Sequence, residues 1–244
     1  MVRRRSALRV LDDTLRHAGH ADIVRELIDG SAGLTPQSLN LPDGESRWER
    51  MSGMTADPKD DLRRYLQQAR EAMVWKAEGL SEYDARRPLV PTGTNLLGMI
   101  KHLAGTELLY FGFTFGRPSP YALPFDDDDP LADLFVTAGE SRAEVIDGYR
   151  RVWAFADTTI EQLPLDAAGK VPHWDPEHAE VTLHQILVHV IAETHRHAGH
   201  ADIVRELIDG SAGRFAGNSN LPGEDEVSWP DHWQRVEQAA RDAG

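Results

Sequence analysis

The sequence predicts an all-α protein, a four-helix bundle preceded by an extension that repeats the last helix and its tail. Two observations give this prediction. Apolar residues recur at spacings of three and four along four long segments after Met54, and eighteen residues near the N-terminus recur near the C-terminus. No alternating apolar and polar pattern of useful length, which would indicate strands, competes with the helical periodicity. An all-α bundle follows.

The four predicted helices follow one another between residues 57 and 209. Asp57-Pro58 opens the first, Ser141 with Glu144 makes a capping box for the third, and Gly210 ends the fourth. Connections are expected to be short at 79–93 and long at 117–140 and 164–181. The helices are expected from Pro58 to about Glu78, from a cap at Thr94 to about Gly116, from Ser141 to about Leu163, and from Thr182 to Asp209.

The N-terminal extension is a partial copy of the end of the chain. Arg16 to Gly33 read RHAGHADIVRELIDGSAG, and the same eighteen residues stand at Arg196 to Gly213, an offset of 180. Residues 40–42 repeat at 220–222 in the same register. Residues 1–53 hold 8 basic and 8 acidic side chains, so the whole net charge of -14 belongs to residues 54–244. We therefore divide the chain into an extension, 1–53, that copies part of 181–230, and a bundle domain, 54–244.

Two hypotheses account for this extension. In one, it is a remnant of an adjacent gene copy, or an upstream extension of a protein that naturally starts at Met51 or Met54. In the other, the copied helix competes for the place of the original or packs beside it. An isolated helix of this length is marginal in water, so its apolar positions need cover. Docking on the bundle of the same chain, or of a second chain in a homodimer, is favoured over fraying. These apolar positions are Ile23, Val24, Leu27 and Ile28.

Composition excludes several classes of function. The net charge of -14 repels phosphate backbones, so nucleic acid is not an expected partner. The chain has no cysteine, which excludes disulfides, cysteine-ligated zinc and a thiol nucleophile of its own. No apolar run reaches the roughly 18 to 20 residues that span a bilayer, and no signal-peptide pattern follows the basic N-terminus. A cytoplasmic protein with no membrane partner is expected.

Histidines are concentrated in the fourth predicted helix, and their spacing there indicates which of them share one helix face. His189, Glu193 and His197 are four residues apart and lie along one helix face. Glu193 and His197 can grip one metal ion, but a ligand from outside the helix must complete the site. His102 is the only histidine within another long helix. It is either a core histidine satisfied by a carboxylate or that missing ligand, and spacing alone does not decide between them.

Two segments resemble the second and fourth helices of the DinB-like superfamily, over residues 54 to about 240. They are LLGMIKHLAGTELLYFGFTFGRP and ILVHVIAETHRHAGHADIVRELIDG. The resemblance implies a four-helix bundle that binds a divalent metal through one histidine of the second helix and a His-x3-His or Glu-x3-His pair of the last. Carried over, these ligands are His102, Glu193 and His197. Glu193 stands where many members have histidine, which is similar to mycothiol-dependent maleylpyruvate isomerase.

The resemblance also implies a chemistry, because the superfamily includes mycothiol and bacillithiol S-transferases. Three protein ligands on Zn²⁺ leave one position for water or substrate, and a small thiol would bind there as thiolate. The ligand set also suits Ni²⁺ or Fe²⁺. The implied function is a metal-dependent transferase or isomerase that joins a mycothiol-type thiol to an electrophile. The alternative is a non-catalytic metal-binding or stress-associated bundle, in which the ion staples helices together.

Four further residues are candidates for the site. His189 is a candidate either to support a metal ligand without touching the metal or to act as a general base, and His200 is a rival ligand. Both compete with a purely structural or solvent-exposed role. Arg117 and Arg196 are candidates to bind a carboxylate-bearing cosubstrate, against the commoner role of a surface arginine.

The copied helix is not expected to hold a second metal. Arg9, Asp13 and His17 occupy the positions that correspond to His189, Glu193 and His197. An arginine stays protonated and repels a cation, and the copy brings no equivalent of the histidine on the second helix.

Overall fold

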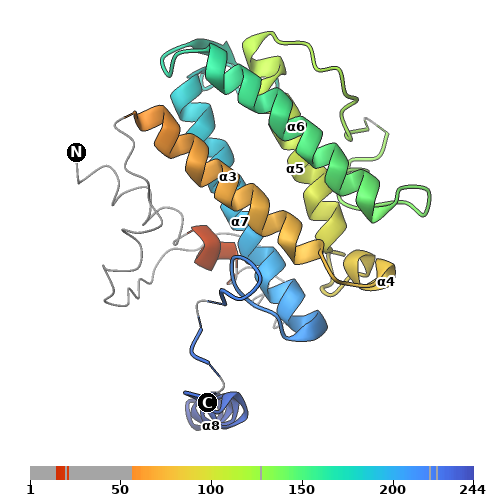
Figure 1. Cartoon of the computed structure of the whole chain (residues 1–244), viewed down its shortest axis with the longest axis vertical. Coiled ribbons are helices and arrows are strands. Elements are labelled where there is room, and N and C mark those ends of the chain that lie inside the picture. The colour runs from red at the N-terminus through yellow and green to blue at the C-terminus, as the bar shows by residue number, and fades with distance from the viewer. Residues whose placement is uncertain (1–14, 20, 22–56, 127, 220, 224) are drawn as a thin grey trace.

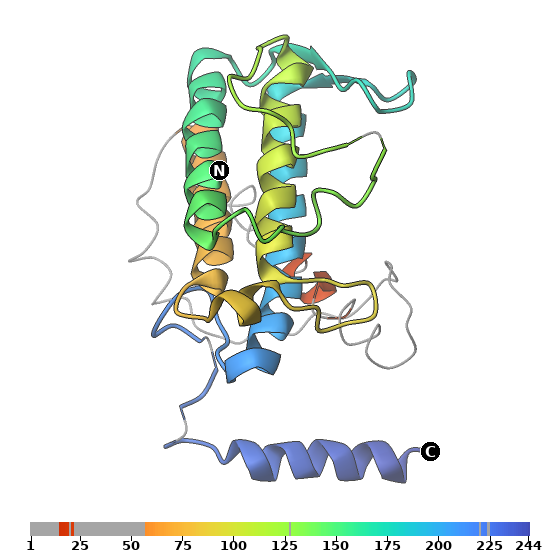
Figure 2. The same ribbon diagram turned by 90° about the vertical axis from the view of Figure 1, so that its right-hand side faces the viewer.

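Four long helices form a bundle in this computed structural model of residues 1–244, which describes residues 15–19, 21, 57–126, 128–219, 221–223 and 225–244. The helices pair into two layers, with α3 beside α6 and α5 beside α7 (Figures 1 and 2). Across the layers, α3 packs closely on α7 and α5 on α6. The predicted all-α class is confirmed. The bundle helices are α3 (Pro58–Ala77), α5 (Leu96–Phe111), α6 (Arg142–Gln162) and α7 (Leu183–Asp209).

Local capping interactions set the helix ends. Ser141 and Glu144 form the predicted capping box of α6, each side chain accepting a hydrogen bond from the other residue's backbone N–H. Thr182 and Gln185 form a second capping box at the start of α7. Gly210 ends α7 in the left-handed conformation, with φ 75°, which a glycine adopts without the penalty of a Cβ.

The cap of the second bundle helix differs from the prediction. The N-cap of α5 is Asn95, whose Oδ1 accepts a hydrogen bond from Gly98 N at 2.8 Å, and not Thr94. Thr94 instead shares a hydrogen bond between its hydroxyl and that of Thr92. Asparagine and threonine both serve as caps, so the neighbouring loop decides which of the two is used.

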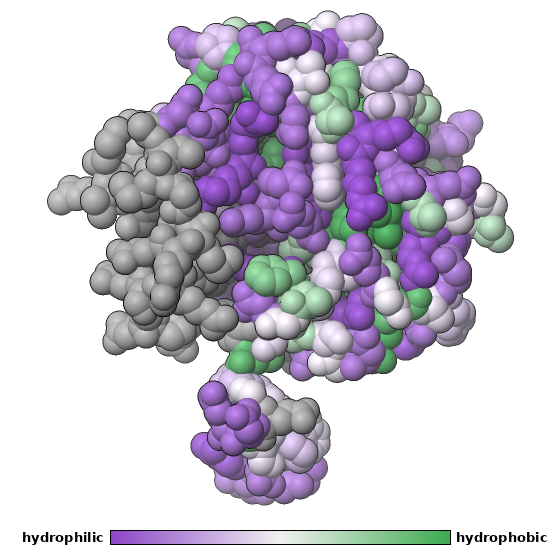
Figure 3. Space-filling model, viewed as in Figure 1, coloured by the Kyte–Doolittle hydropathy of each residue, from purple (hydrophilic) through white to green (hydrophobic). Residues whose placement is uncertain are grey.

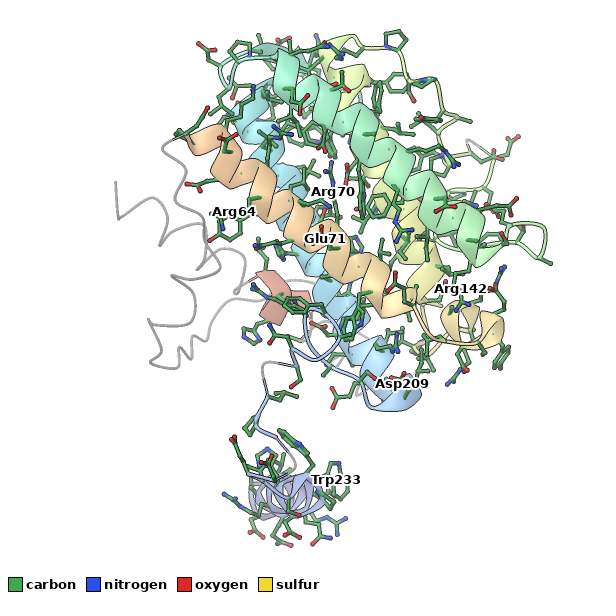
Figure 4. All side chains as sticks on the ribbon, viewed as in Figure 1. Arg64, Arg70, Glu71, Arg142, Asp209 and Trp233 are labelled. Atoms are coloured by element: carbon green, nitrogen blue, oxygen red, sulfur yellow. The ribbon has the colours of Figure 1, made fainter. Side chains whose placement is uncertain are left out.

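Smaller elements fill the connections and the C-terminus. A two-stranded antiparallel sheet, with Val181 paired opposite Gly169, lies in the connection before α7. Helix α8 lies apart from the bundle, has no buried residue, and leaves Trp233 65% exposed (Figures 1 and 4). The smaller elements are α4 (Glu82–Arg86), η1 (Phe113–Phe115), β1 (Ala168–Lys170), β2 (Glu180–Thr182) and α8 (Trp229–Asp242). The second helix was expected to run to about Gly116, but α5 ends at Phe111 and the 3₁₀ turn η1 takes up the remaining residues. The other small elements were not predicted.

The apolar core of the bundle forms two clusters stacked along its axis. One lies towards the start of α5 and the other towards its end. The surface seen in Figure 3 is mostly hydrophilic, with apolar residues in small groups. None of the helices in the described ranges combines the length and the apolarity needed to cross a membrane. Central members of the clusters are Met73, Ile100, Leu103 and Val204 in the first, and Leu66, Phe111, Ile160, Ile186 and Val190 in the second.

A buried ion pair joins three of the helices. Arg70 of α3, 1% exposed, points into the bundle and donates two hydrogen bonds to Glu107 of α5, at 2.9 and 2.6 Å (Figure 4). The Tyr149 hydroxyl of α6 donates to the same carboxylate, and Arg70 also donates to Asp157. Burial alone would lower the pKa of Arg70, but the two carboxylates more than offset it and raise this pKa. Arg70 therefore stays protonated, and its guanidinium donates hydrogen bonds to carboxylates of both α5 and α6.

The described part of the N-terminal copy docks on α7 of the same chain. Residues 15–19 are helical, and Arg16 donates hydrogen bonds to both carboxylate oxygens of Asp202, at 2.5 and 2.7 Å. Asp202 also pairs with Lys76 of α3, which is fully buried. Burial lowers the pKa of Lys76 to about 8, against the opposing effect of Asp202. The copied apolar positions Ile23, Val24, Leu27 and Ile28 lie outside the described residues.

We predict that Glu107→Gln lowers the free energy of unfolding by about 3 kcal/mol, because it leaves the Arg70 guanidinium buried opposite a neutral amide. Urea unfolding followed by far-UV circular dichroism measures the change.

The matched control is Glu161→Gln, which breaks an ion pair between α3 and α6, Arg63–Glu161, whose side chains are 34% and 56% exposed. The expected loss there is about 0.5 kcal/mol, because water screens the pair. Equal losses in the two variants would contradict the assignment of Arg70–Glu107 as the dominant ion pair of the bundle.

Candidate metal centre

Three side chains from two helices converge on one point. His102 comes from α5, and Glu193 and His197 come from successive turns of α7. Each offers a ligand atom, and these three atoms lie within 4.8 Å of one another. His197 Nε2 is 3.1 Å from Glu193 Oε1, and His102 Nε2 is 3.9 Å from the same oxygen. The structure therefore brings together all three residues that the sequence analysis proposed as metal ligands.

A carboxylate that the sequence analysis missed orients the histidine of α5. Asp133 Oδ2 lies 2.6 Å from His102 Nδ1, and its side chain is 8% exposed. The bond to the carboxylate keeps the proton on Nδ1, which leaves the lone pair of Nε2 turned toward Glu193 and His197. A carboxylate bound to the far nitrogen of a ligating histidine is a common arrangement at metal sites. Asp133 lies in the long connection before α6, where no helical period could have placed it.

The segment that carries Asp133 is fixed to the first turn of α5. The cap residue Asn95 donates a hydrogen bond from Nδ2 to the carbonyl oxygen of Leu134, at 3.0 Å. That same carbonyl lies so close to Gly98 that a Cβ added there would be 1.9 Å from its oxygen. Only glycine permits this approach. His102 follows one turn later, so cap, glycine and carboxylate together set its ring.

The charges at the cluster favour a cation. The neighbouring imidazoles of His102 and His197 hold the pKa of Glu193 well below its usual range, so the carboxylate is ionised at neutral pH. Burial lowers the pKa of His102, but Glu193 and Asp133 more than offset this and raise it. Two partly buried carboxylates thus face two imidazoles. A divalent cation would compensate the carboxylates while the imidazoles stay neutral.

The donor set fits a transition metal with a free coordination position. Two imidazole nitrogens and one carboxylate oxygen are ligands that Zn²⁺, Ni²⁺ and Fe²⁺ accept. The ligand residues are 17% to 33% exposed, which leaves the cluster open to solvent on one side. A catalytic zinc site has this composition, since three protein ligands leave a fourth position for water or substrate. The residues present therefore fit the metal that the resemblance implies.

His189 lies one turn before Glu193 in an aromatic environment. Its ring centroid is 4.8 Å from that of Tyr110 and 5.1 Å from that of Trp174. Trp174 donates a hydrogen bond from Nε1 to the Tyr110 hydroxyl, at 3.2 Å, and His173 Nε2 lies 3.5 Å from the same oxygen. Burial lowers the pKa of His189, which keeps its ring neutral at pH 7. We call these four residues the aromatic wall. Only His189 among them was singled out from the sequence.

The other candidates lie outside the three-residue cluster. The ring of His200 is 5.3 Å from that of His197 but contributes no atom to the converging set. Arg117 follows η1 beyond the end of α5, and its backbone N–H donates to Gly112 O. The carbonyl of Arg196 faces Gly19 of the docked copy. A role in binding a carboxylate-bearing cosubstrate stays a prediction for both arginines. In the copy, His17 is exposed, whereas Arg9 and Asp13 lie outside the described residues.

A family model described as mycothiol-S-transferase matches residues 2–30 and 61–210. The chain belongs to this family. The DinB-like resemblance is thereby confirmed, since the mycothiol S-transferases are members of that superfamily. The second matched range contains the metal cluster, Asp133 and the aromatic wall. The first range, moved by the repeat offset of 180, becomes 182–210, which is the end of the second. No curated protein and no solved structure matches the chain.

We predict that Asp133→Asn weakens zinc binding about 10- to 100-fold, because His102 loses the carboxylate that fixes its ring and raises its basicity. Competition against a chromogenic zinc chelator measures the dissociation constant.

Asp126→Asn is the control, since Asp126 lies in the same connection and is exposed. Its zinc affinity should equal that of the unmodified protein. If Asp133→Asn also bound zinc with unchanged affinity, Asp133 would have no part in the site.

Proposed function

We propose that the protein is a metal-dependent S-transferase that joins a mycothiol-type thiol to an electrophile, with His102, Glu193 and His197 as the metal ligands. The match to the mycothiol-S-transferase family over most of the chain carries this proposal. The convergence of three metal-binding side chains inside the matched range supports it. Zn²⁺ is the preferred ion, and Ni²⁺ or Fe²⁺ also suits the donors.

The residues of the cluster explain why the chain needs no cysteine. A bound divalent metal lowers the pKa of a thiol that reaches it and so favours the thiolate at neutral pH. Asp133 keeps the Nε2 lone pair of His102 available, and Glu193 supplies negative charge to hold the cation. The nucleophilic sulfur then belongs to the cosubstrate.

His189 is the proposed acceptor of the thiol proton. Its ring is neutral at pH 7 and lies one helical turn from Glu193, on the side of the aromatic wall. As the thiol S–H bond breaks, the proton passes to a ring nitrogen of His189. The sulfur electron pair forms the new carbon–sulfur bond while the bond from that carbon to the leaving group breaks, and the leaving group departs with the electron pair of the broken bond. Trp174, which is partly exposed, offers an apolar surface beside this position, suited to the carbon skeleton of an electrophile.

We predict that removing the metal abolishes thiol transfer while the chain stays helical, because the two apolar core clusters hold the bundle without an ion. The metal-loaded protein should carry about one divalent ion per chain. Conjugation of mycothiol to a panel of electrophiles and the far-UV signal are measured before and after chelation.

His102→Ala/His197→Ala is the matching variant and should lose both metal and activity. Full activity after complete metal removal would contradict the proposed chemistry. Collapse of the helical signal on chelation, with no activity in the loaded protein, would favour the alternative in which the ion staples α5 to α7.

We predict that His189→Phe lowers kcat about 100-fold or more and leaves the metal content unchanged, because the variant keeps an aromatic ring against Tyr110 and Trp174 but loses the proton acceptor. Steady-state kinetics and metal analysis measure the two effects.

His184→Phe is the control on the same helix, since His184 is exposed. It should retain the original kcat. Unchanged kcat in His189→Phe would remove this residue from proton transfer.

A further inference from the structure

The docked copy and α7 contact each other through equivalent residues of the repeat. A Cβ added at Gly19 would lie 2.2 Å from the carbonyl oxygen of Arg196, and a Cβ added at Gly199 would lie 2.1 Å from that of Arg16. The repeat offset of 180 makes Arg16 the equivalent of Arg196 and Gly19 the equivalent of Gly199. The two close approaches are therefore one contact made twice, once in each direction.

The two contacts are related by a local two-fold axis between the helical segments. Residue 16 contacts residue 202 and residue 19 contacts residue 199, so the two helical segments run antiparallel. In a two-fold interface the same patch appears on both sides, and each contact has a mate with the roles exchanged. Two copies of one sequence within a single chain here make the contact that two identical subunits make in a symmetric dimer.

The contact is closely packed and charge-matched. Neither glycine could carry a side chain without displacing backbone of the other segment. Arg16 and Asp202 are 7% and 5% exposed, and both oxygens of Asp202 accept hydrogen bonds from Arg16. Gly213 O accepts a further bond from the same guanidinium, at 2.9 Å. A second chain would present the same guanidinium from its own residue 196, because the repeat is identical there.

We propose that the face of α7 carrying Arg196, Gly199 and Asp202 is a self-association surface, and that residues 15–19 occupy it in place of α7 from a second chain. The extension thus keeps the protein monomeric, because it occupies the surface that α7 of a second chain would otherwise contact. This inference is independent of the proposed thiol chemistry, since it rests on the repeat and on its contacts.

The test is Gly19→Leu in the full chain, which blocks docking of the copy and leaves α7 unaltered. Sedimentation velocity should give a monomer of 27.2 kDa for the unmodified protein and twice that mass for the variant. Release of the copy is followed independently by trypsin, since Arg16 is buried when docked. Cleavage after Arg16 should be about tenfold faster in the variant.

Two further variants complete the comparison. Gly199→Leu blocks both docking of the copy and association of two chains, so it should cleave rapidly yet remain monomeric. Ala21→Leu changes an exposed position of the copy and should behave as the unmodified protein.

Three results would overturn the proposal. A Gly19→Leu variant that cleaves rapidly but stays monomeric would show that exposed α7 does not associate. Unchanged cleavage would contradict the docked geometry itself. An unmodified dimer that Gly19→Leu dissociates would mean that the copy docks across chains.

Discussion

The antiparallel register of α5 on α7 is the constraint on which the site depends. It places His102 opposite the turn between Glu193 and His197, and two turns further along α5 it places Tyr110 beside His189. A slip of one residue would move a ligand about 1.5 Å, which is most of a zinc–nitrogen bond length of about 2 Å. The buried pair of Arg70 with Glu107 lies between these two levels of α5 and anchors it to α3. The positions of the three candidate metal ligands and of the aromatic wall therefore both depend on this register.

Periodic features of this molecule could be predicted from the sequence, whereas contacts between segments of irregular structure could not. Glu193 and His197 follow from four-residue spacing on one helix. The ligand role of His102 could be predicted only from the family resemblance, because the spacing of residues along α7 does not indicate which residue of another helix faces them. Asp133 and Trp174 lie in connections without a period, so only the folded chain brings them to the site. Asn95 replaced the expected cap because its amide also reaches a carbonyl of the following connection.

The elements that the sequence did not predict are either short or have few buried residues. Strands β1 and β2 have three residues each, too few for an alternating pattern to register. Helix α8 is amphipathic but buries none of its residues in the described structure. The duplicated segment differs, because its identity with the end of α7 was plain in the sequence. What the sequence could not supply was the geometry of the contact, which depends on two glycines meeting across an axis.

The close approach of Leu134 to Gly98 divides the long connection before α6 into parts with different freedom. Leu134 is fixed to the start of α5 by a backbone contact and an amide hydrogen bond, whereas Pro124 and Phe125 pack against Gly105 further along the same helix. An exposed position of this connection, such as Asp126, can therefore change without turning the imidazole of His102. The connection thus combines exposed positions that can vary with two residues, Asp133 and Leu134, whose placement sets the ring of a candidate metal ligand.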